Sequence, residues 1–221
     1  MRRIGKTMVA ATLSLVAGVT AARAQLTGIP VYVNPRGGTG IGVAANLGFP
    51  DSHSGAGTAY GVAGGFGVGP VTLTGMVGAW SPKGYSAQTS FGGDIAYRLF
   101  GGGMLPVAVG LQAGFGSVKY PLALGGGSTR TTIPVGIGLS LDPPLFPLKP
   151  WIAPRVEFVS GGGVSASSFR ISAGVNLNLL LGLGVHAAVD WGKVPSKVDP
   201  KTPTTLIWGV GAHFYFHVPV M

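Results

Sequence analysis

The chain has 221 residues, of which 40 are glycine, 10% are charged and none is cysteine. The absence of cysteine excludes a disulfide framework, thiolate metal ligands and a cysteine nucleophile, and a glycine-rich composition with a mean hydropathy of +0.46 is unusual for a soluble globular domain. The formal net charge of +9 is not gathered in a basic stripe interleaved with aromatic residues, so nucleic acid is not expected as a partner.

Residues 1–24 have the organisation of a secretory signal peptide. A basic start is followed by an apolar run from Met8 to Val19 and by a small-x-small cleavage site at Ala22–Ala24. The run is shorter than the roughly 18 apolar residues of a spanning helix, which disfavours the alternative of an uncleaved anchor. We therefore expect export and a mature chain that begins at Gln25, with four cations fewer and a formal charge of +5.

Residues 25–36 form a lead-in before the first strand. Pro30 and Pro35 separate this segment from the pattern that follows. We expect it either at the periplasmic rim or inside the lumen of the barrel predicted below for residues 37–221, where it would act as a plug.

The rest of the chain alternates bulky apolar side chains with glycine or small polar ones. In the stretch from Thr205 to Val218 the even positions, such as Trp208 and Val210, are bulky, whereas the odd positions are mostly glycine and histidine. Because successive residues of a strand face opposite sides, one face of such a stretch is apolar. The same pattern occurs in nine further stretches, at about residues 39–49, 58–68, 71–80, 90–100, 105–118, 131–141, 151–160, 168–179 and 183–192.

The connections between these stretches alternate between long and short. We expect long loops at 50–57, 81–89, 119–130, 161–167 and 193–203, short turns at 69–70, 101–103 and 181–182, and a connection of intermediate length at 142–150. Bacterial outer-membrane barrels have long outer loops, short periplasmic turns and an even number of strands. The sequence therefore predicts an all-β fold, a single antiparallel up-and-down transmembrane β-barrel with both termini in the periplasm. Ten strands fit best, with eight or twelve as alternatives.

Aromatic residues of the apolar face fall near the strand ends, where transmembrane barrels carry aromatic girdles. The outer girdle would contain Phe49, Tyr60, Phe91, Phe115, Phe158, Phe169, Trp191 and Trp208, and the inner one Phe66, Tyr97, Phe214 and Phe216. A soluble β-sandwich or lipocalin-like barrel would instead bury the bulky face and expose glycine and alanine, which predicts poor solubility. We expect the bulky face to contact lipid and the glycine-rich face to line a lumen.

On these features the mature chain resembles the superfamily of small bacterial outer-membrane β-barrel proteins, by pattern rather than by a single motif. The resemblance implies the outer membrane of a Gram-negative-type envelope, no cofactor, and outer-membrane lipid, lipopolysaccharide and the assembly machinery as partners. Members commonly end in an aromatic residue that this machinery reads, whereas Phe214 and Phe216 here precede a terminal Met221. Loop cations fit contact with anionic lipid head groups, with plain solvation as the alternative: Lys83, Lys119, Arg130, Lys193, Lys197 and Lys201.

Nine polar side chains are expected to face the lumen, and they are the candidate site: Asp94, Arg98, Arg155, Glu157, Arg170, His186, Asp190, His213 and His217. An ion away from water is costly unless it is paired. We therefore expect Glu157 opposite Arg170 and Arg155 opposite Ser172. A structural ion pair that braces two strands is the first interpretation, and a constriction that selects solutes by charge is the alternative.

The histidines offer a second, weaker site. His186 and His213 come together in one register of their strands, with Asp190 nearby, which would suit a metal ion or acid–base chemistry. Hydrated lumenal groups are the simpler interpretation, and His213 and His217, roughly 13 Å apart along one strand, do not share a metal ion. We predict no metal site, no cofactor and no catalytic residue.

The sequence thus predicts a non-enzymatic integral outer-membrane barrel with a structural or surface-interaction role. A narrow porin-like channel for small solutes is the alternative, and an outer-membrane hydrolase is a more remote one. Omptin-like proteases and lipid A deacylases are enzymes of this superfamily, but their patterns do not transfer. Asp51 and His53 lie in the first outer loop without a second carboxylate pair at the matching rim.

Overall fold

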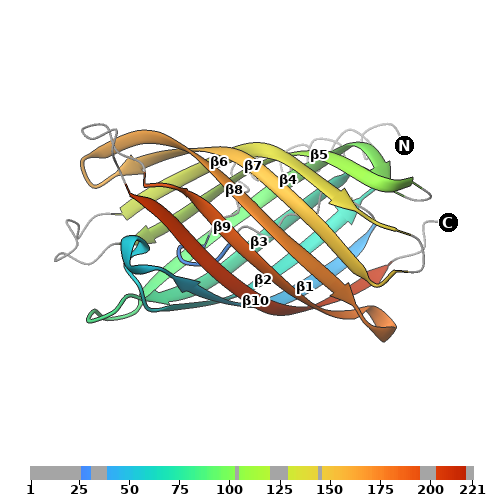
Figure 1. The fold of residues 1–221 in the computed structure, drawn as a ribbon, viewed down its shortest axis with the longest axis horizontal. Helices are drawn as coiled ribbons and strands as arrows, with labels where there is room; N and C mark the ends of the chain where they lie inside the picture. Colours follow the sequence, from blue (N-terminus) through green and yellow to red (C-terminus); the bar gives the residue numbers. More distant parts are fainter. Residues whose placement is uncertain are drawn as a thin grey trace, which may run out of the picture.

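The computed structural model describes residues 26–30, 39–102, 105–119, 129–143, 146–194 and 203–217. These residues form a closed barrel of ten antiparallel strands, in which β1 closes the sheet against β10 (Figure 1). The strands are β1 (Gly40–Pro50), β2 (Thr58–Val68), β3 (Val71–Ser81), β4 (Gln88–Gly102), β5 (Leu105–Lys119), β6 (Thr129–Leu141), β7 (Leu148–Gly161), β8 (Val164–Asn178), β9 (Leu183–Lys193) and β10 (Thr204–His217). Short 3-10 helices, η1 (Ser52–Ser54) and η3 (Leu180–Gly182), follow β1 and β8. The predicted fold class and strand number are confirmed, whereas the predicted signal peptide, residues 1–24, lies outside the described residues.

The two faces of the barrel wall have the predicted orientation. Val43 and Leu47 on β1 are 54% and 45% exposed, whereas Asn46 between them faces the lumen and is 7% exposed. The strands have 11 to 15 residues, enough to cross a hydrocarbon core, which takes about 9–11 residues of tilted strand. Among the described residues, no helix is long and apolar enough to cross a membrane.

The predicted aromatic girdles lie on the outer surface of the barrel. All four aromatic residues of the inner girdle are exposed, and so are those of the outer girdle except Phe115. Phe115 is 9% exposed and packs beside Phe91, with 5.9 Å between the ring centroids. Side chains that are both aromatic and outward-facing near the strand ends suit the interfaces of a membrane.

The hairpin between β7 and β8 differs from the prediction. The expected loop at 161–167 is wrong, because Gly161 already pairs with Val164 and the turn consists of Gly162 and Gly163 alone. Both glycines have positive φ, 66° and 76°, as a tight two-residue hairpin turn requires. The alternation of long and short connections therefore fails at this loop.

The short turn also changes the register of β8 against β7. Arg155 pairs with Arg170 and Glu157 pairs with Ser168, whereas Glu157 was expected opposite Arg170, and Arg155 opposite Ser172. The shift is two residues, so each side chain keeps its predicted face. The two arginines consequently lie directly opposite each other in the lumen.

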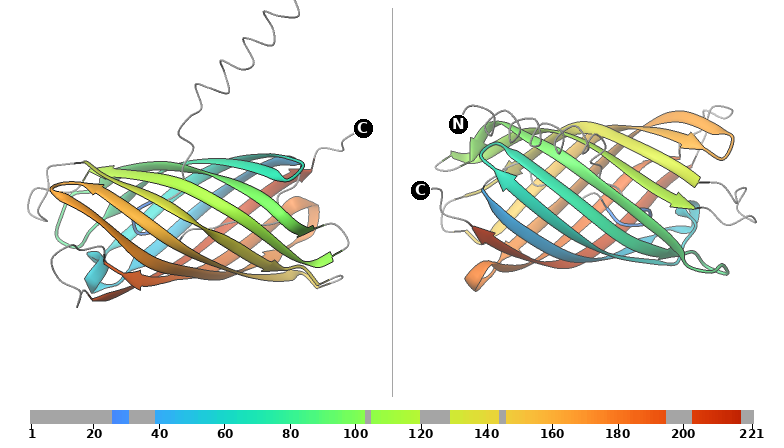
Figure 2. Two further views of the ribbon diagram at one scale, coloured as in Figure 1. Left: turned by 90° about the horizontal axis from the view of Figure 1, so that it is seen from above. Right: turned by 180° about the vertical axis from the view of Figure 1, so that it is seen from behind.

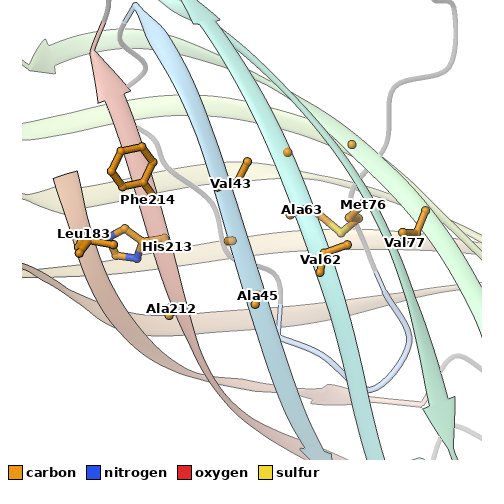
Figure 3. Close-up of a pocket in the computed structure, with 13 residues that line it drawn as sticks. Val43, Ala45, Val62, Ala63, Met76, Val77, Leu183, Ala212, His213 and Phe214 are labelled. Carbon is orange, nitrogen blue, oxygen red and sulfur yellow. The ribbon is translucent and has the colours of Figure 1, made fainter. Parts of the chain in front are cut away.

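A shallow apolar groove of about 640 Å³ lies along β9, β10, β1, β2 and β3, and most of the residues that line it face outward (Figure 3). Its borders are exposed side chains, among them Val43, Val62, Val77, Leu183 and Phe214. Its floor is made by small outward residues: Ala45, Gly64, Gly75 and Ala212. Because the groove lies on the outward apolar face, acyl chains would fill it in a bilayer, and we assign it no ligand.

Candidate functional site

Six polar side chains from four consecutive strands meet in the lumen, in the half that lies toward the β7–β8 and β9–β10 loops. All are at most 5% exposed, and Asp190 and Ser172 are 0% exposed. We call them the charged cluster: Arg155 and Glu157 on β7, Arg170 and Ser172 on β8, Asp190 on β9 and Thr205 on β10. Of the nine predicted site residues, four belong to this cluster.

Every nitrogen of the Arg155 guanidinium donates a hydrogen bond to an oxygen of the cluster. Nε donates to Glu157 Oε1 at 2.8 Å, one terminal nitrogen donates to Ser172 Oγ at 2.6 Å, and the other donates to Asp190 Oδ2 at 2.5 Å. Hydrogen bonds between charged groups of this kind are the strong ones in proteins. Arg155 therefore ties β7 to β8 and β9.

Arg170 makes the equivalent contacts from β8. Its Nε donates to Asp190 Oδ1 at 2.7 Å, one terminal nitrogen donates to Thr205 Oγ1 at 2.9 Å, and the other also reaches Asp190. Glu157 Oε1 lies 3.7 Å from Arg170 Nε. Asp190 thus accepts from both arginines and from Ser172 Oγ, and the two arginines are balanced by two carboxylates, so the cluster carries no formal net charge.

Glycines on the neighbouring strands make room for these arginines. Gly136 pairs with Arg155 and Gly192 pairs with Arg170. A Cβ atom at Gly136 would lie 2.6 Å from Arg155 Cβ, and one at Gly192 would lie 2.9 Å from Arg170 Cβ, closer than such atoms approach. These two lumenal glycines therefore accommodate a large side chain from the next strand.

An apolar layer separates the charged cluster from the histidines along the same wall. Trp151 packs with Ala153 and Ala188, and all three are buried. The indole of Trp151 lies over Gly174 and donates to Asn176 Oδ1 at 3.2 Å. Asp190 thus binds the two arginines. The sequence predicted it near the histidines, but the apolar layer separates it from them.

His186 on β9 and His213 on β10 lie in contact in the other half of the lumen. They occupy diagonal positions, since Gly211 pairs with His186 and Gly184 with His213. Their Nδ1 atoms are 3.0 Å apart, the rings stack with 5.3 Å between centroids, and His186 Nε2 lies 2.8 Å from Asn46 Oδ1. In the described part of the chain, no group of three or more His, Asp or Glu side chains is placed to hold a metal ion.

Two of the three remaining predicted site residues, Asp94 and Arg98, lie on β4. Asp94 on β4 is 6% exposed, pairs across the sheet with Thr74 and is hydrogen-bonded to it. Arg98 lies four residues further along β4, is partly exposed and pairs across the sheet with Gly110 of β5. The side chain of His217, at the end of β10, lies outside the described residues.

Residues 26–30 of the predicted lead-in lie inside the barrel, against β1, β2 and β3 (Figures 1 and 2). We call Leu26–Pro30 the plug segment. Leu26 and Ile29 are 2% and 4% exposed and pack on Ala59 and Trp80. The other residues of the lead-in lie outside the described part of the chain.

Glycines in the wall beside the plug segment leave room for it. A Cβ atom at Gly48 would collide with the carbonyl of Gly28, and one at Gly61 would lie 2.4 Å from a methyl carbon of Leu26. Gly28 itself has a φ of 80°, which favours glycine. Plug and wall are therefore complementary in shape, a feature that the composition of residues 25–36 did not reveal.

Asp51 and His53, the polar pair of the loop between β1 and β2, lie at the N-cap of η1 and within it. Asp51 caps this helix: the Ser54 N–H donates to Oδ1 at 2.8 Å, and the Leu206 N–H of β10 donates to Oδ2 at 2.8 Å. Burial raises the pKa of Asp51, but the hydrogen bonds from Leu206 and Ser54 outweigh it and hold the pKa below the ordinary value of 3.8. The carboxylate thus fastens the loop to the rim of the barrel.

No protein-family model and no curated protein matches the chain. Among solved structures, the β-domain of the Bordetella autotransporter BrkA is 11% identical, with 81% of this chain and 100% of that chain covered and a TM-score of 0.50. The N-terminal β-barrel domain of Pseudomonas aeruginosa OprF is 14% identical over 81% of this chain and 99% of its own, with a TM-score of 0.42. At 11% identity the likeness to the autotransporter β-domain concerns the fold alone, a closed antiparallel β-barrel, whose bulky side chains in this chain face outward.

Proposed function

We propose that the protein is a non-enzymatic integral outer-membrane barrel with a structural or surface-interaction role, closed in the outer half of its lumen. We place the long loops outside and both termini in the periplasm. One observation carries the proposal: the charged cluster and the plug segment occupy neighbouring sectors of the wall in the same half of the lumen. The cluster lies on β7–β10 and the plug against β1–β3, both near the ends at the long loops.

The contacts of the charged cluster favour a structural role, in which it holds neighbouring strands together, over a role in selecting solutes by charge. Each nitrogen of Arg155 and Arg170 already donates to a protein oxygen, so an entering anion would have to displace these hydrogen bonds. Selective pores instead leave charged groups facing the permeating ion. The cluster therefore links four strands at a point where the lumen is already narrowed by the plug.

Planar-bilayer recording of the refolded barrel tests the proposal. Heat-modifiable gel mobility first verifies that the barrel is folded, and we then expect no discrete openings. Discrete openings in the wild type would contradict a closed barrel. If their size or ion selectivity changed in Arg155→Gln or Arg170→Gln, the narrow channel would be the function, with the two lumenal arginines as its selective element.

Cations at the outer rim support a surface role toward the phosphates of lipopolysaccharide. Lys83, Lys119 and Lys193 are exposed at that end, whereas the carboxylate of Asp51 there is engaged with backbone N–H groups. We expect lipopolysaccharide to raise the unfolding temperature of the wild type, and the triple change of these lysines to glutamate to abolish the rise. Lys149→Glu, at the opposite rim, is the control that should keep it.

A further inference from the structure

The contact between His186 and His213 has no role in the proposed function. Both side chains are buried in the lumen, at 7% and 5% exposure, in the half that lies toward the β8–β9 turn. His213 Nε2 is buried without a hydrogen-bond partner, although its Nδ1 is engaged. His213 Nε2 is therefore able to take up a proton from Nδ1 of the same ring.

The hydrogen bonds determine which nitrogens carry protons when both rings are neutral. The amide oxygen Asn46 Oδ1 is an acceptor, so His186 Nε2 donates to it and His186 Nδ1 carries a lone pair. His213 Nδ1 then donates to His186 Nδ1 across the 3.0 Å contact, which leaves His213 Nε2 without a proton. Each imidazole thus offers one basic nitrogen.

The geometry points to a binding site for a divalent metal ion of the kind that imidazole prefers, Zn²⁺, Cu²⁺ or Ni²⁺, with His186 Nδ1 and His213 Nδ1 as ligands. Bonds of about 2.0–2.1 Å to one ion, at angles of about 90–110°, place two nitrogens about 2.9–3.4 Å apart. The observed separation of 3.0 Å matches this range. The ion takes the place of the hydrogen bond between the two Nδ1 atoms, and the proton of that hydrogen bond leaves His213 Nδ1.

The displaced proton has a place to go within the same ring. When His213 Nδ1 binds the ion, its proton moves to the vacant Nε2, so the pair binds without net proton release. His186 meanwhile keeps its Nε2–H on Asn46, the arrangement by which a second residue orients a metal-ligating histidine. Since no third His, Asp or Glu of the described residues joins the pair, water or a lumenal solute would complete the coordination.

The backbone around the pair is shaped to hold both rings. A Cβ at Gly211 would lie 2.8 Å from His186 Cε1, and one at Gly184 would lie 2.7 Å from His213 Cε1. Tyr215 packs on the far side of His213, with 4.9 Å between the ring centroids. These contacts keep the rings close, so little reorganisation is needed when the ion binds.

Calorimetric titration of the refolded barrel with Zn²⁺ tests the site. We expect one ion per barrel, no binding of Mg²⁺, and at least a tenfold loss of affinity in His186→Ala and in His213→Ala. Asn46→Ala should weaken binding by about 10–100-fold, as loss of an orienting partner does. His53→Ala, in the outer loop, is the matched control and should bind as the wild type does.

A spectroscopic measurement separates the site from a general loss of structure. The Cu²⁺ form should show coupling to two nitrogens by electron paramagnetic resonance, and to one in His213→Gln, which keeps a polar side chain without the ring. Heat-modifiable mobility verifies the fold of each variant. Absence of Zn²⁺ binding to the wild type, or unchanged affinity in folded His186→Ala or His213→Gln, would overturn the proposal and leave the closed-barrel function untouched.

Discussion

Asp190 is the residue on which the charged cluster depends. Its two carboxylate oxygens accept from Arg155, Arg170 and Ser172, and its side chain is 0% exposed. Asp190→Asn would leave two opposed arginines with Glu157 as the one remaining carboxylate of the cluster. Breaking a buried ion pair in this way costs about 3–5 kcal/mol. We expect that loss in the free energy of unfolding, measured by denaturant titration in lipid vesicles.

Asp142 provides the control for this change. Its carboxylate pairs with Lys149 at 3.0 Å near the other rim, where both side chains are partly exposed. Such pairs contribute about 0–1 kcal/mol, so Asp142→Asn should change the stability by no more than that. Equal effects of the two substitutions would mean that water reaches the charged cluster and that it does not seal the lumen.

Asp51 gives the loop between β1 and β2 a dependence on pH. Its folded-state pKa lies below the ordinary value of 3.8, so its contribution to stability is complete above that value and is lost as the pH falls through the lower pKa. We expect the Ser54 and Leu206 amide resonances to titrate with a midpoint below pH 3.8 in NMR spectra. A midpoint at or above 3.8 would contradict the cap, and Asp51→Asn should abolish the titration.

The plug segment is the element whose removal should change access to the lumen. Leu26→Asp combined with Ile29→Asp would place two carboxylates against Ala59 and Trp80, where the wild type has an apolar contact. Burying unpaired charge is costly, so the segment should leave its site. A cysteine introduced at Ala59, which is 0% exposed, should then react with a water-soluble maleimide at least tenfold faster than the same cysteine in a protein with the wild-type plug segment.

The cysteine-free sequence makes this measurement specific. Ala153→Cys, equally buried behind Trp151 on the opposite wall, reports whether the barrel as a whole has loosened. Its labelling should not change with the plug. Unchanged labelling at Ala59, or equal acceleration at both positions, would show that the plug does not seal that wall.

The strands were predictable from the sequence because their pattern has a period of two. Alternation alone places Val43 outward and Asn46 inward, whichever residue of the next strand lies opposite. It does not determine register, which depends on the turns, and the two-residue turn at Gly162–Gly163 shifted β8 by two positions. Glu157 and Arg170 therefore lie in one cluster, as the shared face implied, but with Asp190 rather than Glu157 as the main partner of Arg170.

The filling of the lumen was less accessible to sequence analysis. The lumenal glycines Gly48, Gly136 and Gly192 each lie beside a group from another element, which the alternating pattern alone does not show. Such complementarity depends on register and on contacts between segments far apart in the chain. Gly136 and Gly192 indicate space for an arginine side chain only once the register is known, because Arg155 and Arg170 are the residues that pair with them.

In the molecule as a whole, the outward face of the barrel wall is the one that contacts the hydrocarbon of the membrane. Val62 and Val68 both lie on β2, face outward and are similarly exposed, at 56% and 55%. They differ in depth, since Val62 lies near the middle of the strand and Val68 at its end. In a soluble barrel arginine would be tolerated at both positions, because both would face water.

In a membrane the same two substitutions should differ sharply. Arginine on the lipid face costs about 2–4 kcal/mol at the midplane and about 0–1 kcal/mol near an interface. We therefore expect Val62→Arg to lower the free energy of unfolding in lipid vesicles by about 2–4 kcal/mol and Val68→Arg by less than about 1 kcal/mol. Equal, small effects would contradict a transmembrane barrel, because the depth dependence arises only from a hydrocarbon layer across β2.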